Sequence, residues 1–110
     1  MANSFKRKLS RSIGTSLTAV GSYTVAASTE VTVIGLVVSN TTSSQVLVDA
    51  TVNDGSNDTY LIKQAPVPSG GALVIIGGDQ KVVLETNDSL KVKSDTASSV
   101  DVVMSLLEIT

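Results

Sequence analysis

The stretch QVLVDATV, residues 45–52, alternates between apolar and polar side chains over most of its length. A period of two is typical of a β-strand that buries one face, because successive side chains point to opposite sides of a sheet. The stretch SLKVKS, residues 89–94, repeats the pattern with Leu90 and Val92 on one face and lysines on the other. Both stretches are therefore predicted to be half-buried strands. In residues 45–52 the apolar face is formed by Val46, Val48, Ala50 and Val52.

Two stretches further along the chain are apolar on both faces, EVTVIGLVV at residues 30–38 and VVMSLLEI at residues 102–109. Strands of this kind lie at the centre of a sheet or beneath another surface. We therefore expect both to be central strands or to be covered at an interface. Further strands are predicted at residues 22–26, 59–64, 72–76 and 81–86.

Polar turns rich in Asn, Asp, Ser, Gly and Pro separate these stretches. They fall at residues 39–44, 53–58, 65–71, 77–80 and 86–88. The repeated strand and turn signals, about 8–12 residues apart, indicate a sandwich or barrel. We predict an all-β fold, a single antiparallel β-sandwich of about eight strands with jelly-roll-like connectivity, over residues 15–110.

The composition restricts the chemistry available. The chain contains no cysteine and no histidine, so it lacks thiols, disulfides and the commonest general base and metal ligand. The acidic turn NDGSND, residues 53–58, offers oxygen ligands without the spacing of a calcium loop. Asp49 is predicted on the polar face of its strand, whereas Glu108 shares a face with Met104 and is predicted to be paired at an interface or to lie where the strand emerges. We expect no enzymatic activity, no cofactor and no metal.

Basic residues are concentrated in SFKRKLSR, residues 4–11, which holds Lys6, Arg7, Lys8 and Arg11. The other four basic residues share residues 12–110 with all ten acidic residues, which leaves a net charge of −6 there and +4 in residues 1–11. Residues 1–14 are therefore predicted to form a basic N-terminal arm distinct from the body.

The arm has a spacing that fits one stripe of a short helix, with Phe5, Leu9 and Ile13 four residues apart. A frayed, solvated segment is the alternative. If the segment is a helix, its apolar stripe docks on a neighbouring copy while its cations meet the acidic surface of that copy. The residues predicted to bind a partner are Phe5, Lys6, Arg7, Lys8, Leu9, Arg11 and Ile13.

Nucleic acid and membranes are disfavoured as partners. Four cations without interleaved aromatic residues are a weak nucleic-acid signal, and the acidic body would repel phosphate. No apolar run approaches the roughly 20 residues that a membrane-spanning helix needs.

Three segments carry a resemblance to a known group of proteins: VIGLVVSNTT, PVPSGGALVIIGGDQKVVLETNDSLKVKS and the closing SVDVVMSLLEIT. Over nearly its whole length the chain resembles small virion-associated structural proteins of tailed bacteriophages, particularly marine cyanophages. The resemblance implies a β-sandwich that works in many copies, as a homo-oligomer such as a trimer or higher ring, together with other virion proteins. It implies location in the virion, as a head-decoration, neck, tail or fibre protein, after assembly in the host bacterial cytoplasm.

A binding module is the alternative function. In this interpretation the loops at residues 39–44, 53–58 and 65–71 recognise host surface carbohydrate or a host protein. The candidate contact residues are Asp54, Asn57, Asp58 and Tyr60. The scarcity of aromatic residues argues against it, because sugar sites usually stack a ring.

Overall fold

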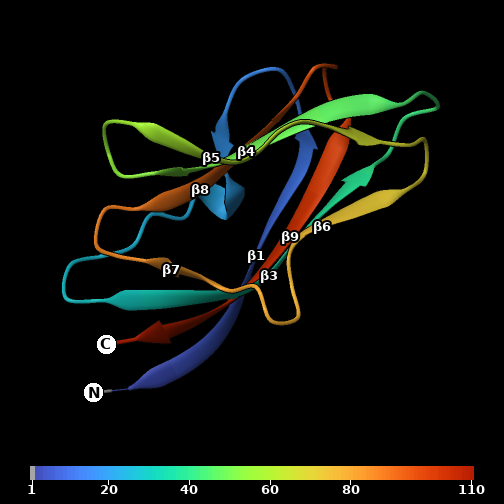
Figure 1. The fold of residues 1–110 in the computed structure, drawn as a ribbon. Coiled ribbons are helices and arrows are strands. Elements are labelled where there is room, and N and C mark those ends of the chain that lie inside the picture. The colour runs from blue at the N-terminus through green and yellow to red at the C-terminus, as the bar shows by residue number, and fades with distance from the viewer. Residues whose placement is uncertain (1) are drawn as a thin grey trace.

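The computed structural model describes residues 2–110, which form nine strands and one short 3-10 helix (Figure 1). Within these residues no helix is long and apolar enough to cross a bilayer. The elements are β1 (Asn3–Ile13), β2 (Thr18–Ala19), η1 (Val20–Ser22), β3 (Glu30–Asn40), β4 (Val46–Asn53), β5 (Asp58–Val67), β6 (Ala72–Ile76), β7 (Val82–Leu84), β8 (Ser89–Ser94) and β9 (Val100–Ile109).

The strands form two antiparallel sheets. The five-stranded sheet has the order β1-β9-β3-β6, with β7 also paired to β3, and the four-stranded sheet has the order β2-β8-β4-β5. Because β6 and β7 pair with successive stretches of β3, they act as one interrupted strand. Eight strands in these two orders have the connectivity of a jelly roll. The predicted antiparallel sandwich of about eight strands is confirmed.

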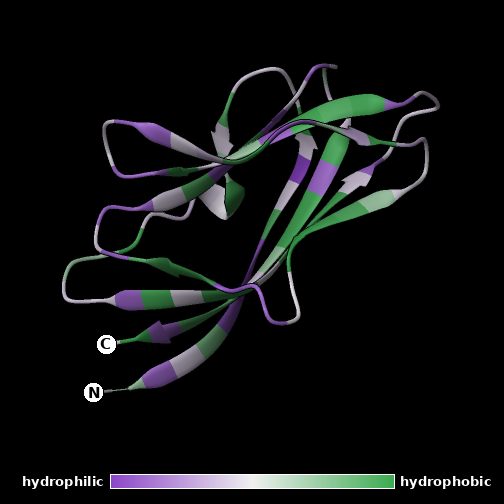
Figure 2. Ribbon diagram, in the orientation of Figure 1, coloured by the Kyte–Doolittle hydropathy of each residue, from purple (hydrophilic) through white to green (hydrophobic). Residues whose placement is uncertain are grey.

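The core lies between the two sheets and consists mainly of branched aliphatic side chains. Along β4 the apolar face read from residues 45–52 points inward, and Val46, Val48 and Ala50 are buried. The two stretches that are apolar on both faces, β3 and β9, are central strands as expected, because β9 lies between β1 and β3. Figure 2 shows apolar residues concentrated along β3, β6 and β9.

Two predicted segments differ from the structure. Residues 22–26 were expected to be a strand, but Ser22 is the last residue of η1 and residues 23–26 have no regular structure. Strand β5 continues to Val67, so the turn predicted at residues 65–71 begins only at Pro68. Strand β5 can contain Pro66 because it is an edge strand, where a missing backbone donor breaks no central ladder.

The prediction of a separate, helical N-terminal arm is wrong. Residues 3–13 form strand β1, which pairs with β9 from Asn3 opposite Ile109 to Ile13 opposite Val100. A spacing of four residues fits a strand as well as a helix, because it keeps parity. A bulge with Ser12 at a φ of 54° then shifts the register and turns Ile13 into the core.

Candidate functional site

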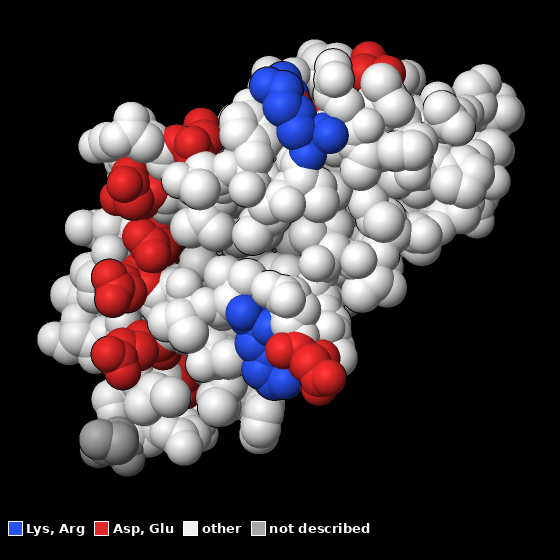
Figure 3. Space-filling model, in the orientation of Figure 1, with Lys and Arg blue, Asp and Glu red and all other residues white. Residues whose placement is uncertain are grey.

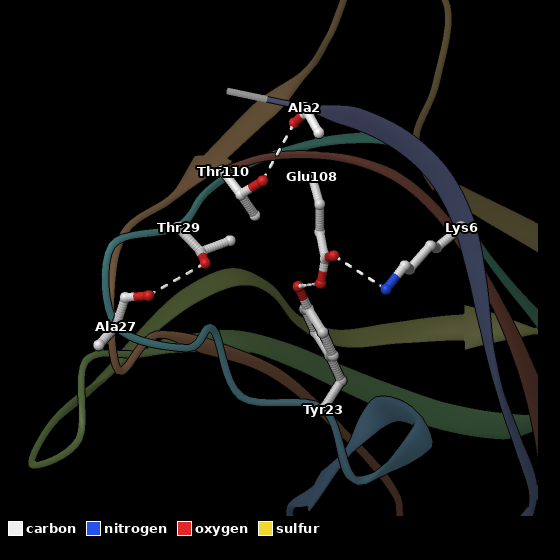
Figure 4. Close-up of polar contacts among 7 residues, drawn as sticks. All are labelled: Ala2, Lys6, Tyr23, Ala27, Thr29, Glu108 and Thr110. Atoms are coloured by element: carbon white, nitrogen blue, oxygen red, sulfur yellow. Dashed lines mark hydrogen bonds and ion pairs between the residues drawn. The ribbon is translucent and has the colours of Figure 1, made fainter.

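The inward-facing cations of β1 contact their own chain. The Lys6 Nζ lies 3.0 Å from Glu108 Oε1, and the Tyr23 hydroxyl donates a hydrogen bond of 2.5 Å to Glu108 Oε2 (Figure 4). The Lys8 Nζ lies 4.9 Å from the centre of the Tyr23 ring, in the position of a cation–π contact. These four residues, Lys6, Lys8, Tyr23 and Glu108, are called the β1 clamp below. The clamp joins three parts of the chain: β1, β9 and the segment that follows η1.

The electrostatics of the β1 clamp favour a structural role. The Glu108 side chain is only 15% exposed, and the hydrogen bond from Tyr23, followed by that from Lys6, lowers the pKa of its carboxyl. Burial, together with the hydrogen bond to Glu108, raises the pKa of Tyr23 well above its ordinary value of 10.0. A general acid or base works best with a pKa near the operating pH. Both pKa values are shifted away from neutrality, and the contacts of both groups hold β1 against the rest of the chain.

Two further contacts hold β1 in place. The backbone N–H of Gly21 donates a hydrogen bond of 2.8 Å to Ser10 Oγ, which ties η1 to the inner side of β1. Gly21 has a φ of 62°, and a Cβ there would lie 2.7 Å from the Cβ of Lys8, so only glycine permits this approach. At the bulge, the N–H of Ser12 donates to Asp101 Oδ1 at 2.9 Å.

The outward-facing residues of β1 belong to a broad apolar surface. Among residues 2–110, five of the six large hydrophobic side chains that are exposed lie on the outer side of the five-stranded sheet, away from the core. This surface is called the outer face below. Its exposed apolar residues are Phe5, Leu9, Val74, Val83 and Val103, while Tyr60 on β5 is the sixth exposed residue.

The structure divides the predicted arm residues among three environments. Lys6 and Lys8 are in the β1 clamp, and Ile13 is in the core with 4% exposure, so Ile13 is not available to a partner. The predicted role of Ile13 in partner binding is therefore wrong. The alternation of β1 places the remaining arm residues on the outer face: Phe5, Arg7, Leu9 and Arg11.

The loop candidates do not form one site. Strand β4 separates the turn at residues 53–58 from the loop at 39–44, so these lie at opposite ends of the sandwich (Figure 1). The loop at 39–44 instead meets the loop after β5, where Ser69 Oγ donates to the carbonyl of Thr42 at 2.8 Å. The three candidate loops are therefore divided between the two ends of the sandwich, with 39–44 and 65–71 at one end and 53–58 at the other.

Within the turn at 53–58 the polar groups serve the turn itself. Asp54 Oδ1 accepts hydrogen bonds from the backbone of Asn57 and Ser56, and these bonds lower the pKa of its carboxyl. Asp58 Oδ1 accepts from Thr51 Oγ1 and Asn53 Nδ2. Among residues 2–110 no three acidic side chains converge as metal ligands would.

Tyr60 lies on β5 beyond this turn, 43% exposed, and Lys63 Nζ lies 4.8 Å from its ring centre. The lysine therefore occupies one side of the ring that a sugar would have to stack against.

Asp49 is on the outer side of β4, as predicted, but the structure buries it. A bulge in β5 brings the N–H of Gln64 to within 2.6 Å of Asp49 Oδ1, and Lys93 Nζ lies 3.6 Å from Oδ2. Gln64 has a φ of 53°, the left-handed conformation that turns its N–H toward the carboxylate. The carboxylate thus stabilises a bulge on the four-stranded sheet.

Some site residues were not foreseen from the sequence. Tyr23 carried no signal, because its role depends on η1 bringing it beneath β9. Val74 and Val83 lie on the short strands β6 and β7, and the sequence does not show which of their valines face outward. Val103 could have been found, because residues 102–109 are apolar on both faces.

Comparisons with known proteins identify the fold only. No family model matches the chain, and no curated protein matches it. Among solved structures, it is similar to a chain from work that describes Bacillus endospore appendages as a novel family of disulfide-linked pili. The match has a TM-score of 0.58 at 11% sequence identity and covers 98% of this chain and 88% of the other. At this identity the likeness concerns the fold alone.

Proposed function

We propose that the protein is a non-enzymatic structural subunit that associates with copies of itself. The observation that supports this is the outer face, where five of the six large hydrophobic side chains exposed in the described part of the chain gather on one sheet. Large apolar patches on soluble proteins mark interaction surfaces. The polar clusters described above are engaged in holding strands and turns, which leaves the apolar surface as the feature available for binding.

The sequence resemblance supplies the setting of this proposal. It suggests a virion protein of a tailed bacteriophage that binds other virion proteins as well as itself and is assembled in the bacterial cytoplasm. The structurally similar chain comes from pili described as disulfide-linked. This chain has no cysteine, so any assembly would be held by noncovalent contacts. Such contacts suit a reducing cytoplasm.

Sedimentation velocity of the purified chain tests self-association. At roughly 1–100 μM, a micromolar association is populated and the average mass should rise with concentration. A strictly monomeric protein over this range would contradict the proposal. For the virion assignment, capsid, portal or tail genes beside the coding sequence would support it, whereas a set of metabolic genes would contradict it.

A carbohydrate- or protein-binding module has less support. The loop at residues 53–58 lies at the opposite end of the sandwich from the loops at 39–44 and 65–71, and Lys63 covers one side of the Tyr60 ring. Binding of a glycan array that is lost on Tyr60→Ala would nevertheless favour the module over the structural subunit.

A further inference from the structure

The outer face is organised in rows that cross the strands. Because the register is fixed, Leu9 lies opposite Val103, Val103 lies opposite Val37, and Val37 lies opposite Val74. This first row is entirely aliphatic and spans four strands. Directly opposed side chains on one face of a sheet are in contact distance, so the row is a continuous apolar surface.

A second row runs parallel to the first. It contains Phe5 opposite Leu107, then Thr32 opposite both Leu107 and Val83. Between the two rows, at the centre of the face, Ser105 lies opposite Arg7 on one side and Gly35 on the other. Ser105 and Gly35 have small or no side chains, so neither projects above the two apolar rows.

The size of the outer face is sufficient for a specific interface. Across the strands, the four strands of the face span roughly 19 Å. Along the strands, the stretch from Phe5 to Arg11 with its flanking residues is roughly 27 Å long. The projected area is therefore about 500 Å² on each copy, or about 1,000 Å² for two copies, which is the lower bound for specific interfaces.

The charges on the outer face are balanced. Alternation along the strands places Arg7 and Arg11 on this face at β1, together with Glu30 on β3 and Asp101 on β9. These are two charges of each sign, whereas the whole chain carries −2. Acidic side chains instead gather along one side of the molecule, at the end with the β4–β5 and β7–β8 turns (Figure 3). A face that carries equal numbers of both signs can meet a copy of itself without net repulsion.

The edge of the same sheet is protected from pairing with itself. Strand β1 is a long edge strand, and a second β1 added beside it would bring four cations against four cations. Lysine and arginine on edge strands are a common device against edge-to-edge pairing. Association between copies is therefore directed away from the edge and toward the face.

We propose that the outer face is the interface of a two-fold symmetric homodimer, in which a second copy of this chain packs its own outer face against the first. In a two-fold interface the same patch serves both partners. The arrangement places two sheets face to face, as the two sheets of a β-sandwich pack. This inference rests on the proposed self-association and specifies the surface and the symmetry.

Val103→Lys tests the proposed interface, because Val103 lies in the middle of the aliphatic row and is 47% exposed, so its replacement leaves the core intact. The matched control is Tyr60→Lys, a residue of similar exposure on the other sheet. Sedimentation equilibrium should show a dimer for the unchanged protein and for Tyr60→Lys. For Val103→Lys the dissociation constant should rise at least about 30-fold, with an unchanged far-ultraviolet circular dichroism spectrum.

A single introduced cysteine gives an independent readout, because the chain has none of its own. Ser105→Cys places a thiol at the centre of the outer face, near the expected two-fold axis, and a short bismaleimide should link it to its counterpart. Tyr60→Cys should remain unlinked. The absence of a cross-linked Ser105→Cys dimer would overturn the proposal.

The outcomes separate this inference from the proposed function. A monomeric unchanged protein would overturn both. A dimer or larger oligomer that Val103→Lys leaves intact, or that Tyr60→Lys weakens equally, would overturn the outer-face interface while self-association stands. Trimers or higher rings that persist in Val103→Lys would likewise place the interface elsewhere.

Discussion

Removing the Tyr23 hydroxyl is the sharpest test of how β1 is held. Tyr23 is half-buried and donates to the Glu108 carboxylate at 2.5 Å, and a hydrogen bond to a charged group contributes about 1.5–3 kcal/mol to stability. Lys6 also contacts Glu108, but its side chain is 47% exposed, and ion pairs this open contribute about 0–1 kcal/mol. We expect Tyr23→Phe to lower the free energy of unfolding by about 2 kcal/mol and Lys6→Met by less than about 1 kcal/mol.

Urea unfolding followed by far-ultraviolet circular dichroism measures both changes, and a double-mutant cycle with Glu108→Gln isolates the Tyr23–Glu108 interaction. The expected coupling is about 1 kcal/mol or more, since the amide keeps an acceptor but loses the charge. Tyr60→Phe is the matched control on an exposed ring and should change stability by less than about 0.5 kcal/mol. A Lys6→Met cost equal to that of Tyr23→Phe, or no coupling in the cycle, would refute the reasoning.

Three further results are expected. In the folded protein the pKa of Glu108 lies below its ordinary value of 4.5, so the stabilisation from this carboxylate is present above pH 4.5 and is lost as the pH falls through the folded pKa. On acidification the urea midpoint of the unchanged protein should therefore drop more than that of Glu108→Gln. Gly21→Ala should cost at least about 1 kcal/mol more than Gly78→Ala, because both glycines have positive φ but only Gly21 approaches Lys8. Deletion of residues 2–13 should abolish cooperative unfolding, since β9 loses β1, one of its two pairing strands, and the core loses Ile13; a folded remainder would support the separate arm.

The body of the fold could be predicted because its signals are local. The alternation in residues 45–52 fixes which face of β4 is buried, and the stretches that are apolar on both faces occupy the centre of the five-stranded sheet. Polar turns set the spacing between strands. Each of these features depends on neighbouring residues alone, so sequence patterns describe them well.

The N-terminal segment could not be assigned because its own residues do not decide its structure. Phe5, Leu9 and Ile13 recur every four residues, a spacing that helices and strands both accept. What decides the outcome is the free edge of β9, about 100 residues away, which offers unpaired backbone groups to any strand that reaches it. A sequence pattern contains no information on such a long-range partner.

In the candidate site, too, local features could be predicted and long-range partners could not. The position of Glu108 on the inner side of β9 followed from parity, and the sequence left open whether Glu108 is paired at an interface or lies where the strand emerges. In the structure the partners are Lys6 and Tyr23 of the same chain. Identifying Tyr23 required the path of η1, which a short 3-10 turn does not reveal in advance.

The position of β1 explains why a net acidic chain begins with basic residues. A strand exposes alternate side chains to opposite sides, so one run of cations serves two purposes. The inward pair, Lys6 and Lys8, reaches Glu108 and Tyr23 and attaches β1 to its own body. The outward pair, Arg7 and Arg11, balances the acids of the outer face, while all four cations keep the exposed edge from pairing with another β1. Charge that was expected to reach a neighbouring copy thus acts first within the chain, and the interface proposed for a second copy lies on the apolar outer face.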